Sequence, residues 1–180
     1  MIGIEPLTPE HFATVAGWLS KPEINQWLTG EWRDRVVDPT LIGVAVRNKR
    51  NRFFLARSDG VPSGLVALAD WDAVDKIAMI WYALGDPASG GRGVITQAIR
   101  ELVRTAFDTL GIEALHAWIM EDNERSRRAL EKNGFREAGR LRRAAVHNSR
   151  RIDRVYLDLT RQDPRAGFAD ASVGIVAVAS

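Results

Sequence analysis

The chain has 180 residues, of which 46% are hydrophobic and 27% are charged, and its formal net charge is +2. These values are typical of one globular domain with a sizeable core, and they do not indicate general affinity for nucleic acid. Because the chain has no cysteine, disulfides, thiolate nucleophiles and Cys-ligated zinc are excluded. No apolar run reaches the roughly 18 residues that a membrane span needs.

The histidines and the N-terminal segment narrow the class further. His11, His116 and His147 are scattered without the spacing of metal ligands, so we expect no metal site. Glu5 and Glu10 stand where a signal peptide needs a basic start and an apolar centre. The expected location is therefore the cytoplasm.

A short strand and three helical segments are predicted in the first part of the chain. Thr8–Pro9 and Asp38–Pro39 each supply an N-cap followed by a proline at the first helical position. A further helical piece is expected over residues 22–28. The apolar spacing after each start is that of a helix packed on one side.

The middle of the chain predicts strands and then one long helix. Residues 52–70 read as a hairpin that turns at Asp59–Gly60, and residues 76–84 as a strand buried on both faces. Val94 to Leu110 has the strongest helical periodicity in the sequence, and Gly111 stands where a left-handed residue ends a helix.

The last elements are a strand, a helix and a hairpin. The strand is expected over residues 114–120 and the helix over 123–133, closed by Gly134. Residues 144–160 predict a hairpin that turns near Asn148–Ser149. The order of these elements indicates an α/β sandwich on a mixed sheet.

The stretch SGGRGVITQAI, residues 89–99, places three glycines directly before the long helix. Free N–H groups at a helix start form an anion site, and glycines let a phosphate approach them. A tight strand-to-helix turn that binds nothing is the alternative interpretation. The stretch is neither a Walker motif nor a dinucleotide fingerprint, whose third glycine would have to fall near Thr96.

Two motifs together carry a family resemblance. GGRGVITQA resembles the phosphate loop of the GNAT superfamily of N-acetyltransferases, and NERSRRALEKNGF is similar to its second signature. The resemblance is closest to the RimJ/RimL branch of ribosomal-protein N-terminal acetyltransferases and covers residues 1–160. It implies an α/β fold with a GNAT-type mixed, mostly antiparallel central sheet flanked by helices on both faces. Residues 161–180 form a tail of undetermined role.

The resemblance implies that acetyl-CoA is the cosubstrate. Main-chain N–H groups of the loop would bind its pyrophosphate, at Gly90, Gly91, Arg92, Gly93, Val94 and Ile95. The pantetheine arm would pair with the backbone of Tyr82, Ala83 and Leu84. Asn123 and Ser126 would lie near the thioester, although an N-cap and a solvated first turn explain them equally well. Gly90 departs from the pattern, which has Gln or Arg there, and Ile95 replaces Gly or Ala.

The implied reaction is direct attack of an amine on the acetyl thioester. Asn123 and Ser126 would be catalytic, with Ser126 as the acid for the leaving thiolate, because Leu130 stands where many members carry a tyrosine. Met79 stands about where many members place a glutamate base. Since methionine cannot act as a base, the candidates are carboxylates elsewhere in the chain, namely Asp70, Asp72, Glu121 and Glu31.

The acceptor is expected to be a protein N-terminus or a small amine. Deprotonation at pH 7 costs roughly 4.6 kcal/mol for an alkyl amine and only about 1 kcal/mol for an α-amine. The lack of an obvious base therefore favours the less basic amine. An acidic, aromatic cleft for it is predicted from Trp27, Glu31, Trp32, Asp70, Trp71 and Asp72. The same tryptophans could instead pack on the domain.

Two other functions stay open. Leu130 and Met79 also fit a catalytically weak, regulatory module that binds acyl-CoA. The arginine clusters at 125–128 and 140–143 read as solvated surfaces, as a groove for an acidic partner or, least favoured, as a nucleic-acid site. We expect no nucleic-acid or membrane partner. The apolar tail could pair with a sheet edge, including across a homodimer.

Overall fold

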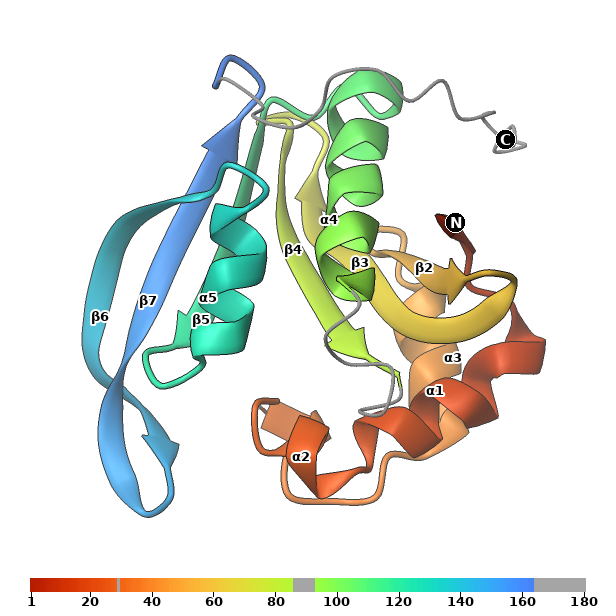
Figure 1. Ribbon diagram of the computed structural model, residues 1–180, viewed down its shortest axis with the longest axis horizontal. Coiled ribbons are helices and arrows are strands. Elements are labelled where there is room, and N and C mark those ends of the chain that lie inside the picture. Colours follow the sequence, from red (N-terminus) through yellow and green to blue (C-terminus); the bar gives the residue numbers. More distant parts are fainter. Residues whose placement is uncertain (29, 86–92, 164–180) are drawn as a thin grey trace.

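The apolar segments of the chain pair into a seven-stranded sheet with the order β1-β2-β3-β4-β5-β7-β6 (Figure 1). The computed structural model describes residues 1–28, 30–85 and 93–163, the side chain of residue 31 excepted. Neighbouring strands are antiparallel except β4 and β5, which are parallel. The strands are β1 (Ile2–Pro6), β2 (Arg52–Ser58), β3 (Val61–Asp72), β4 (Ile77–Leu84), β5 (Ala114–Met120), β6 (Arg136–His147) and β7 (Arg150–Thr160).

Helices cover both faces of this sheet, as the resemblance implies. The α-helices are α1 (Phe12–Leu19), α2 (Pro22–Asn25), α3 (Pro39–Arg47), α4 (Val94–Arg104) and α5 (Glu124–Glu131). Short helical turns are η1 (Pro9–His11), η2 (Gly30–Trp32) and the π-helical η4 (Thr105–Thr109). None of the helices in the described ranges is long and apolar enough to span a membrane.

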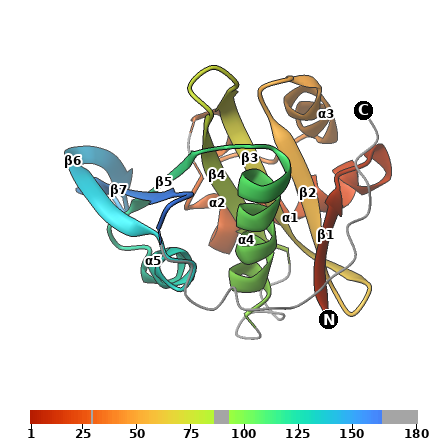
Figure 2. The same ribbon diagram turned by 90° about the horizontal axis from the view of Figure 1, so that it is seen from above.

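Two hydrophobic clusters lie on opposite faces of the sheet. On one face, α4 and α5 pack over Phe54, and Leu102 is fully buried there. On the other face, α1 and α3 pack over Leu55, with Leu19 fully buried. Neighbouring residues in a strand point to opposite faces, so a strand between two helical layers is apolar at successive positions. Figure 2 shows α4 and α5 on one side of the sheet and α3 on the other.

Four local sequence signals, for two turns, a helix end and a cap, are confirmed. Both predicted hairpin turns, at Asp59–Gly60 and Asn148–Ser149, consist of residues with positive φ, as two-residue hairpin turns require. Gly111 also has a positive φ of 66°. Asp38 caps α3, because its Oδ1 accepts the N–H of Thr40 at 2.8 Å.

Three expectations need correction. Thr8 and Pro9 stand at the predicted N-cap and first helical positions, but the segment begins as the turn η1, and the hydroxyl of Thr8 donates to Glu10 Oε1 and makes no capping bond to the backbone. The helical piece expected over 22–28 ends at Asn25. The strand at 76–84 is not buried on both faces, because Trp81 and Tyr82 are half-buried and line a cavity.

The long helix also changes character near its end. The α-helical part stops at Arg104 and continues as a π-helical turn, in which the N–H of Leu110 donates to the carbonyl of Thr105. The hydroxyl of Thr105 donates back to the carbonyl of Glu101 at 2.9 Å, a bond that competes with regular helical pairing. The apolar stripe stays buried through this turn.

Candidate active site

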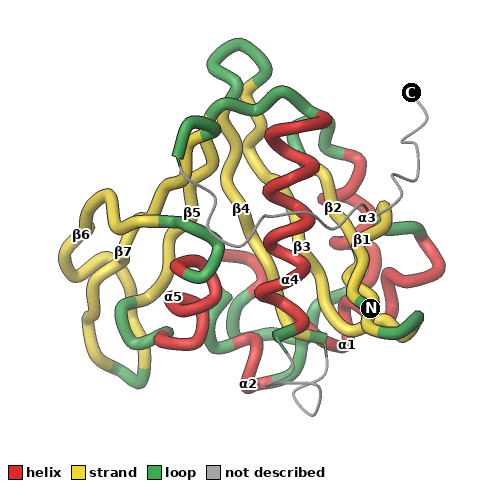
Figure 3. The backbone as a smooth tube through the Cα atoms, turned by 45° about the horizontal axis from the view of Figure 1, so that its top comes forward, coloured by secondary structure: helices red, strands yellow, loops and turns green. Residues whose placement is uncertain are grey.

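β4 and β5 separate in the middle of the sheet. Their parallel pairing runs only from Ile77–Ala114 to Met79–His116, although the strands continue to Leu84 and Met120. β4 remains paired with β3, and β5 with β7. From Ile80 onward, the edge of β4 that faces β5 is therefore paired with no strand in the described residues (Figure 3). Such an edge can accept an extended ligand as an added strand.

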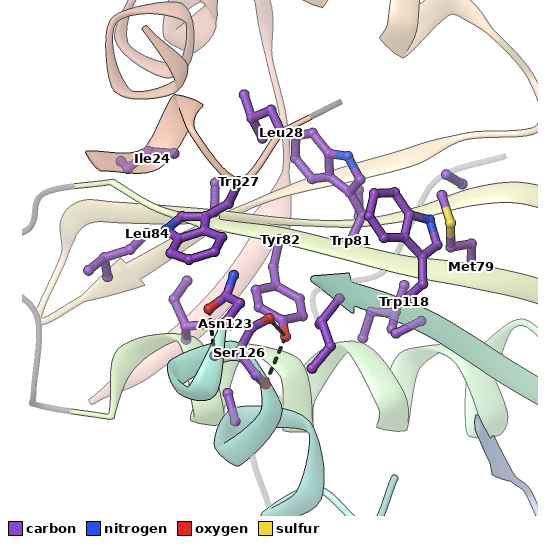
Figure 4. Close-up of a pocket in the computed structure, with 18 of the residues that line it drawn as sticks. Ile24, Trp27, Leu28, Met79, Trp81, Tyr82, Leu84, Trp118, Asn123 and Ser126 are labelled. Carbon is purple, nitrogen blue, oxygen red and sulfur yellow. Dashed lines mark hydrogen bonds between the residues drawn. The ribbon is translucent and has the colours of Figure 1, made fainter. Parts of the chain in front are cut away.

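A cavity of about 1070 Å³ occupies this opening. Its walls come from the separated parts of β4 and β5, the first turns of α4 and α5, and the segment that carries α2 (Figure 4). Ligand sites in proteins typically measure about 300–1,000 Å³, so the cavity is large enough for an elongated molecule.

Tyr82 and Ser126 meet across the opening (Figure 4). The phenolic oxygen of Tyr82 lies 2.5 Å from Ser126 Oγ and 3.2 Å from the carbonyl oxygen of Ser126, to which it donates. Burial raises the pKa of Tyr82 far above its usual value, so the phenol stays protonated. The sequence interpretation used only the backbone of Tyr82. A contact between residues this far apart in the chain leaves no local sequence signal.

Asn123 positions Ser126 at the start of α5. Its Oδ1 accepts the N–H of Ser126 at 3.1 Å, which is the N-cap geometry that the sequence allows. Both residues line the cavity. The side-chain carbonyl oxygen of Asn123 is therefore used in the cap, which orients the first turn of α5 toward the opening.

The first turn of α4 lies at the same cavity. Gly93 precedes the helix with a φ of 71°, and its carbonyl accepts the first helical bond from Gln97. The N–H groups of the first turn, which precede Gln97, have no partner inside the helix, as at every helix start. Ile95 does not crowd them, because its Cδ1 packs over Gly64 on β3, where an added Cβ would lie only 2.8 Å away. The predicted residues Gly90, Gly91 and Arg92 lie outside the described residues.

One face of α5 presents cations to the cavity. Arg125, Arg128 and Lys132 follow one another at helical spacing, and all three line it. Their neighbour Arg127 instead pairs with Glu137, at 3.2 Å. A groove for an acidic partner is one interpretation of this cluster in the sequence, and Arg125 and Arg128 are the arginines of the cluster that line the cavity.

The residues predicted for the acceptor do not all come together. Trp27, Trp32 and Asp70 line the cavity. Trp71 packs toward the opposite face, against the core under α4, and Asp72 accepts two backbone N–H groups in the turn after β3. The side chain of Glu31 is not described. The indoles of Trp81 and Trp118 also line the cavity, and the sequence interpretation had not assigned them to the site.

Asn25 holds the segment that carries Trp27 and Trp32. It is buried, and its Nδ2 donates to the carbonyls of Leu19 and Trp32 at 2.9 and 2.7 Å. Its Oδ1 accepts the N–H of Asp34 at 2.6 Å. One amide therefore organises the loop on this side of the cavity.

The candidate positions for the acid and the base differ in whether they lie at the cavity. Leu130 is fully buried in the core beneath α5. Glu121 accepts the N–H of Asp153 at 3.0 Å and lies outside the cavity lining. Met79 and Asp70 both line the cavity. Asp70 lies close to Met79, because its neighbour Ala69 is the register partner of Met79. Of the described candidate carboxylates, Asp70 is the one at the cavity.

Comparison with known proteins identifies the family. The acetyltransferase (GNAT) domain family matches residues 2–136. The chain therefore belongs to the GNAT acetyltransferase family. YdaF of Bacillus subtilis (strain 168), which bears the provisional name of a ribosomal N-acetyltransferase, is 32% identical over 105 residues. That match covers 58% of this chain and 57% of YdaF, so the chain spans little more than half the length of this curated relative.

Solved structures share the fold. Spermidine N-acetyltransferase from Vibrio cholerae, in complex with CoA and spermine, matches with a TM-score of 0.80 at 17% identity, over 90% of this chain and 96% of that one. RimJ from Mycobacterium smegmatis, in complex with CoA-disulfide, matches with a TM-score of 0.75 at 21% identity, over 89% and 82%. The predicted fold class is confirmed by these matches.

Proposed function

We propose that the protein transfers an acetyl group from acetyl-CoA to a primary amine, either a small molecule or a protein N-terminus. The amine nitrogen bonds to the thioester carbonyl carbon, the C–S bond breaks, and sulfur takes up one proton while nitrogen loses one. The supporting observation is the opening between β4 and β5, which combines a strand edge that no described strand pairs with, a helix start and a cationic wall.

The described residues suit the charge of CoA. The N-terminus of α4 after Gly93 offers N–H groups and the positive end of the helix dipole to a pyrophosphate. Arg125, Arg128 and Lys132 add positive charge along the same cavity. Val94 and Ile95 line the cavity, and their backbone N–H groups belong to the proposed phosphate site.

The edge of β4 suits the extended arm. Tyr82, Ala83 and Leu84 line the cavity, and their backbone groups on the side facing β5 have no strand partner among the described residues. An amide-containing chain can form hydrogen bonds along such an edge as a strand does. This placement brings the far end of the arm toward Tyr82 and Ser126.

Ser126 and Tyr82 would serve the leaving sulfur. Ser126 is the proposed proton donor, held in place by the cap from Asn123. The raised pKa of Tyr82 keeps its phenol a hydrogen-bond donor at neutral pH, so the phenol can support the serine hydroxyl as its proton leaves. When bound, acetyl-CoA supplies the activated acyl group.

Two measurements on the full chain test the proposal. Calorimetry should detect CoA binding in the micromolar range, and a thiol-detecting dye should report CoA release that depends on an added amine. Tight CoA binding without turnover on aliphatic, aromatic, polyamine and peptide amines would favour the acyl-CoA-binding module. An absence of CoA binding would overturn the proposal.

A further inference from the structure

The cavity has an aromatic part beyond the catalytic hydroxyls. Met79 and His116 are register partners in a parallel pair, so Trp81 on β4 and Trp118 on β5 project from the same face of the sheet. That face is the one covered by α1 and α3, because Trp81 packs against the hydrophobic cluster beneath these helices. Its ring also meets that of Phe53 edge to face, with 5.9 Å between the ring centres. Trp27 lines the same cavity from the segment after α2 (Figure 4).

Charge is scarce in this aromatic part. Of the described lining side chains, the carboxylates are Glu23 and Asp70, and the cations belong to α5 across the opening. The guanidinium of Arg154 covers one face of Trp118, at 4.3 Å from the ring centre. A ligand with several positive charges would therefore meet cations and indoles where it needs a row of carboxylates.

Asp70 is the charged group best placed for an amine. It lines the cavity, and it lies in the irregular part of β3 between Ala69 and Asp72, where the register shifts. Its φ is 52°, so the local backbone is turned out of the regular strand path. Such bulges redirect a side chain, here at the strand next to Met79.

We propose that the acceptor is a monoamine with an aromatic or large aliphatic group close to its nitrogen. This inference rests on the proposed function and names its substrate class. The apolar group binds against Trp81 and Trp118, and the ammonium binds at Asp70 and releases one proton to solvent before the neutral amine attacks. A free arylalkyl amine and an N-terminal residue with a large apolar side chain share this chemistry.

A matched set of acceptors tests the class, with CoA release by the full chain as the readout. The set is 2-phenylethylamine, ethylamine, spermidine, and two short peptides that begin with Phe or Ser. Burial of a phenyl group should give 2-phenylethylamine a kcat/KM at least about twentyfold above those of ethylamine and spermidine. The kcat/KM of the Phe peptide should exceed that of the Ser peptide. The ratio of kcat/KM for the Phe peptide to that for 2-phenylethylamine shows whether the acceptor is an N-terminal residue or a free amine.

Charge-removing variants test the role of Asp70. Asp70→Asn keeps the shape and tolerates the positive φ, and it should raise KM for 2-phenylethylamine about tenfold, with kcat changed less than about threefold. Asp72→Asn is the control, because its Oδ1 can still accept from Val74 and Asp75 in the turn outside the cavity. It should leave both constants unchanged.

Trp118→Leu tests the aromatic part. It should reduce the preference for 2-phenylethylamine over ethylamine to less than about threefold, while the affinity for CoA, measured by calorimetry, verifies the fold. A preference for spermidine, or equal rates with ethylamine, would overturn the inference while CoA binding and turnover leave the proposed function standing. Equal KM values for the Asp70 and Asp72 variants would overturn it as well.

Discussion

The hydroxyls of Tyr82 and Ser126 lie 2.5 Å apart and join β4 to α5 across the opening in the sheet. The two residues come from walls that are otherwise separated, because the pairing of β4 with β5 has already ended at Met79. Among the described residues, this is the contact in which two side-chain hydroxyls face each other within the cavity. In the proposed reaction it lies beside the bond that breaks.

The first prediction concerns this pair. Ser126→Ala should lower kcat by about tenfold, since the loss of one hydrogen bond to a developing charge costs about 1.4 kcal/mol. The Kd for CoA should change less than about twofold, because Ser126 is assigned to the chemistry and not to the phosphates. Steady-state kinetics and calorimetry measure the two effects separately.

Tyr82→Phe is the companion variant, because it keeps the buried ring and removes only the hydroxyl. If the two hydroxyls act as one unit, the double variant should be no slower than the slower single variant. Losses that multiply would show independent roles. Since burial raises the pKa of Tyr82, wild-type activity should show no loss from phenol ionisation up to about pH 10.

Gly93 carries the second prediction. Both Gly93→Asp and Gly93→Asn place a side chain of the same size at a φ of 71°, so they share the same backbone strain, roughly 1 kcal/mol. Only aspartate adds a negative charge at the start of α4. The aspartate variant should therefore bind CoA at least about tenfold more weakly than the asparagine variant. Equal CoA affinities with equal melting temperatures would contradict the phosphate site.

Arg128 and Arg127 form a matched pair for the third prediction. Arg128 lines the cavity, whereas Arg127 pairs with Glu137 at 3.2 Å outside it. Arg128→Gln should weaken CoA binding about three- to tenfold, with a smaller effect at high salt, because the interaction is between exposed charges. Arg127→Gln should leave the affinity unchanged, and calorimetry at two salt concentrations distinguishes them.

Local rules explain why much of the fold was predictable. Asn123 capping α5, Gly111 ending the long helix and the Asn148–Ser149 turn depend on residues next to them in the chain. The α4 stripe is equally local, because a 3.6-residue period needs no knowledge of the partner surface. The described part of the first motif, from Gly93 onward, and the start of the second motif at Asn123 lie on these predictable elements.

The cavity walls depend on contacts that no local pattern contains. Trp71 and Trp81 both lie in apolar strands, yet they end on opposite faces because β3 is irregular between Ala69 and Asp72. The bulk of Ile95 is tolerated because a glycine, Gly64, faces it from β3. Such relationships depend on how strands far apart in the sequence pair, and they could not be deduced from spacing.

His116 carries the last prediction, which concerns stability and pH. Burial lowers the pKa of its imidazole, and the nearby charge of Asp70 partly opposes this shift. Its other strand neighbours are Met79 on β4 and Asp158 on β7. The folded protein therefore favours the neutral ring, whereas the unfolded chain binds a proton near its ordinary pKa of about 6.5.

The sign follows from proton counting. Between about pH 6.5 and the lower folded pKa, the unfolded state holds more protons, so stability falls as the pH is lowered through this window. His116→Gln removes this contribution and keeps the carboxylates common to both proteins. Urea unfolding at about pH 7, 6 and 5 should then show a smaller loss of unfolding free energy for the variant than for the wild type. Parallel curves would mean that the ring is not held neutral by its surroundings.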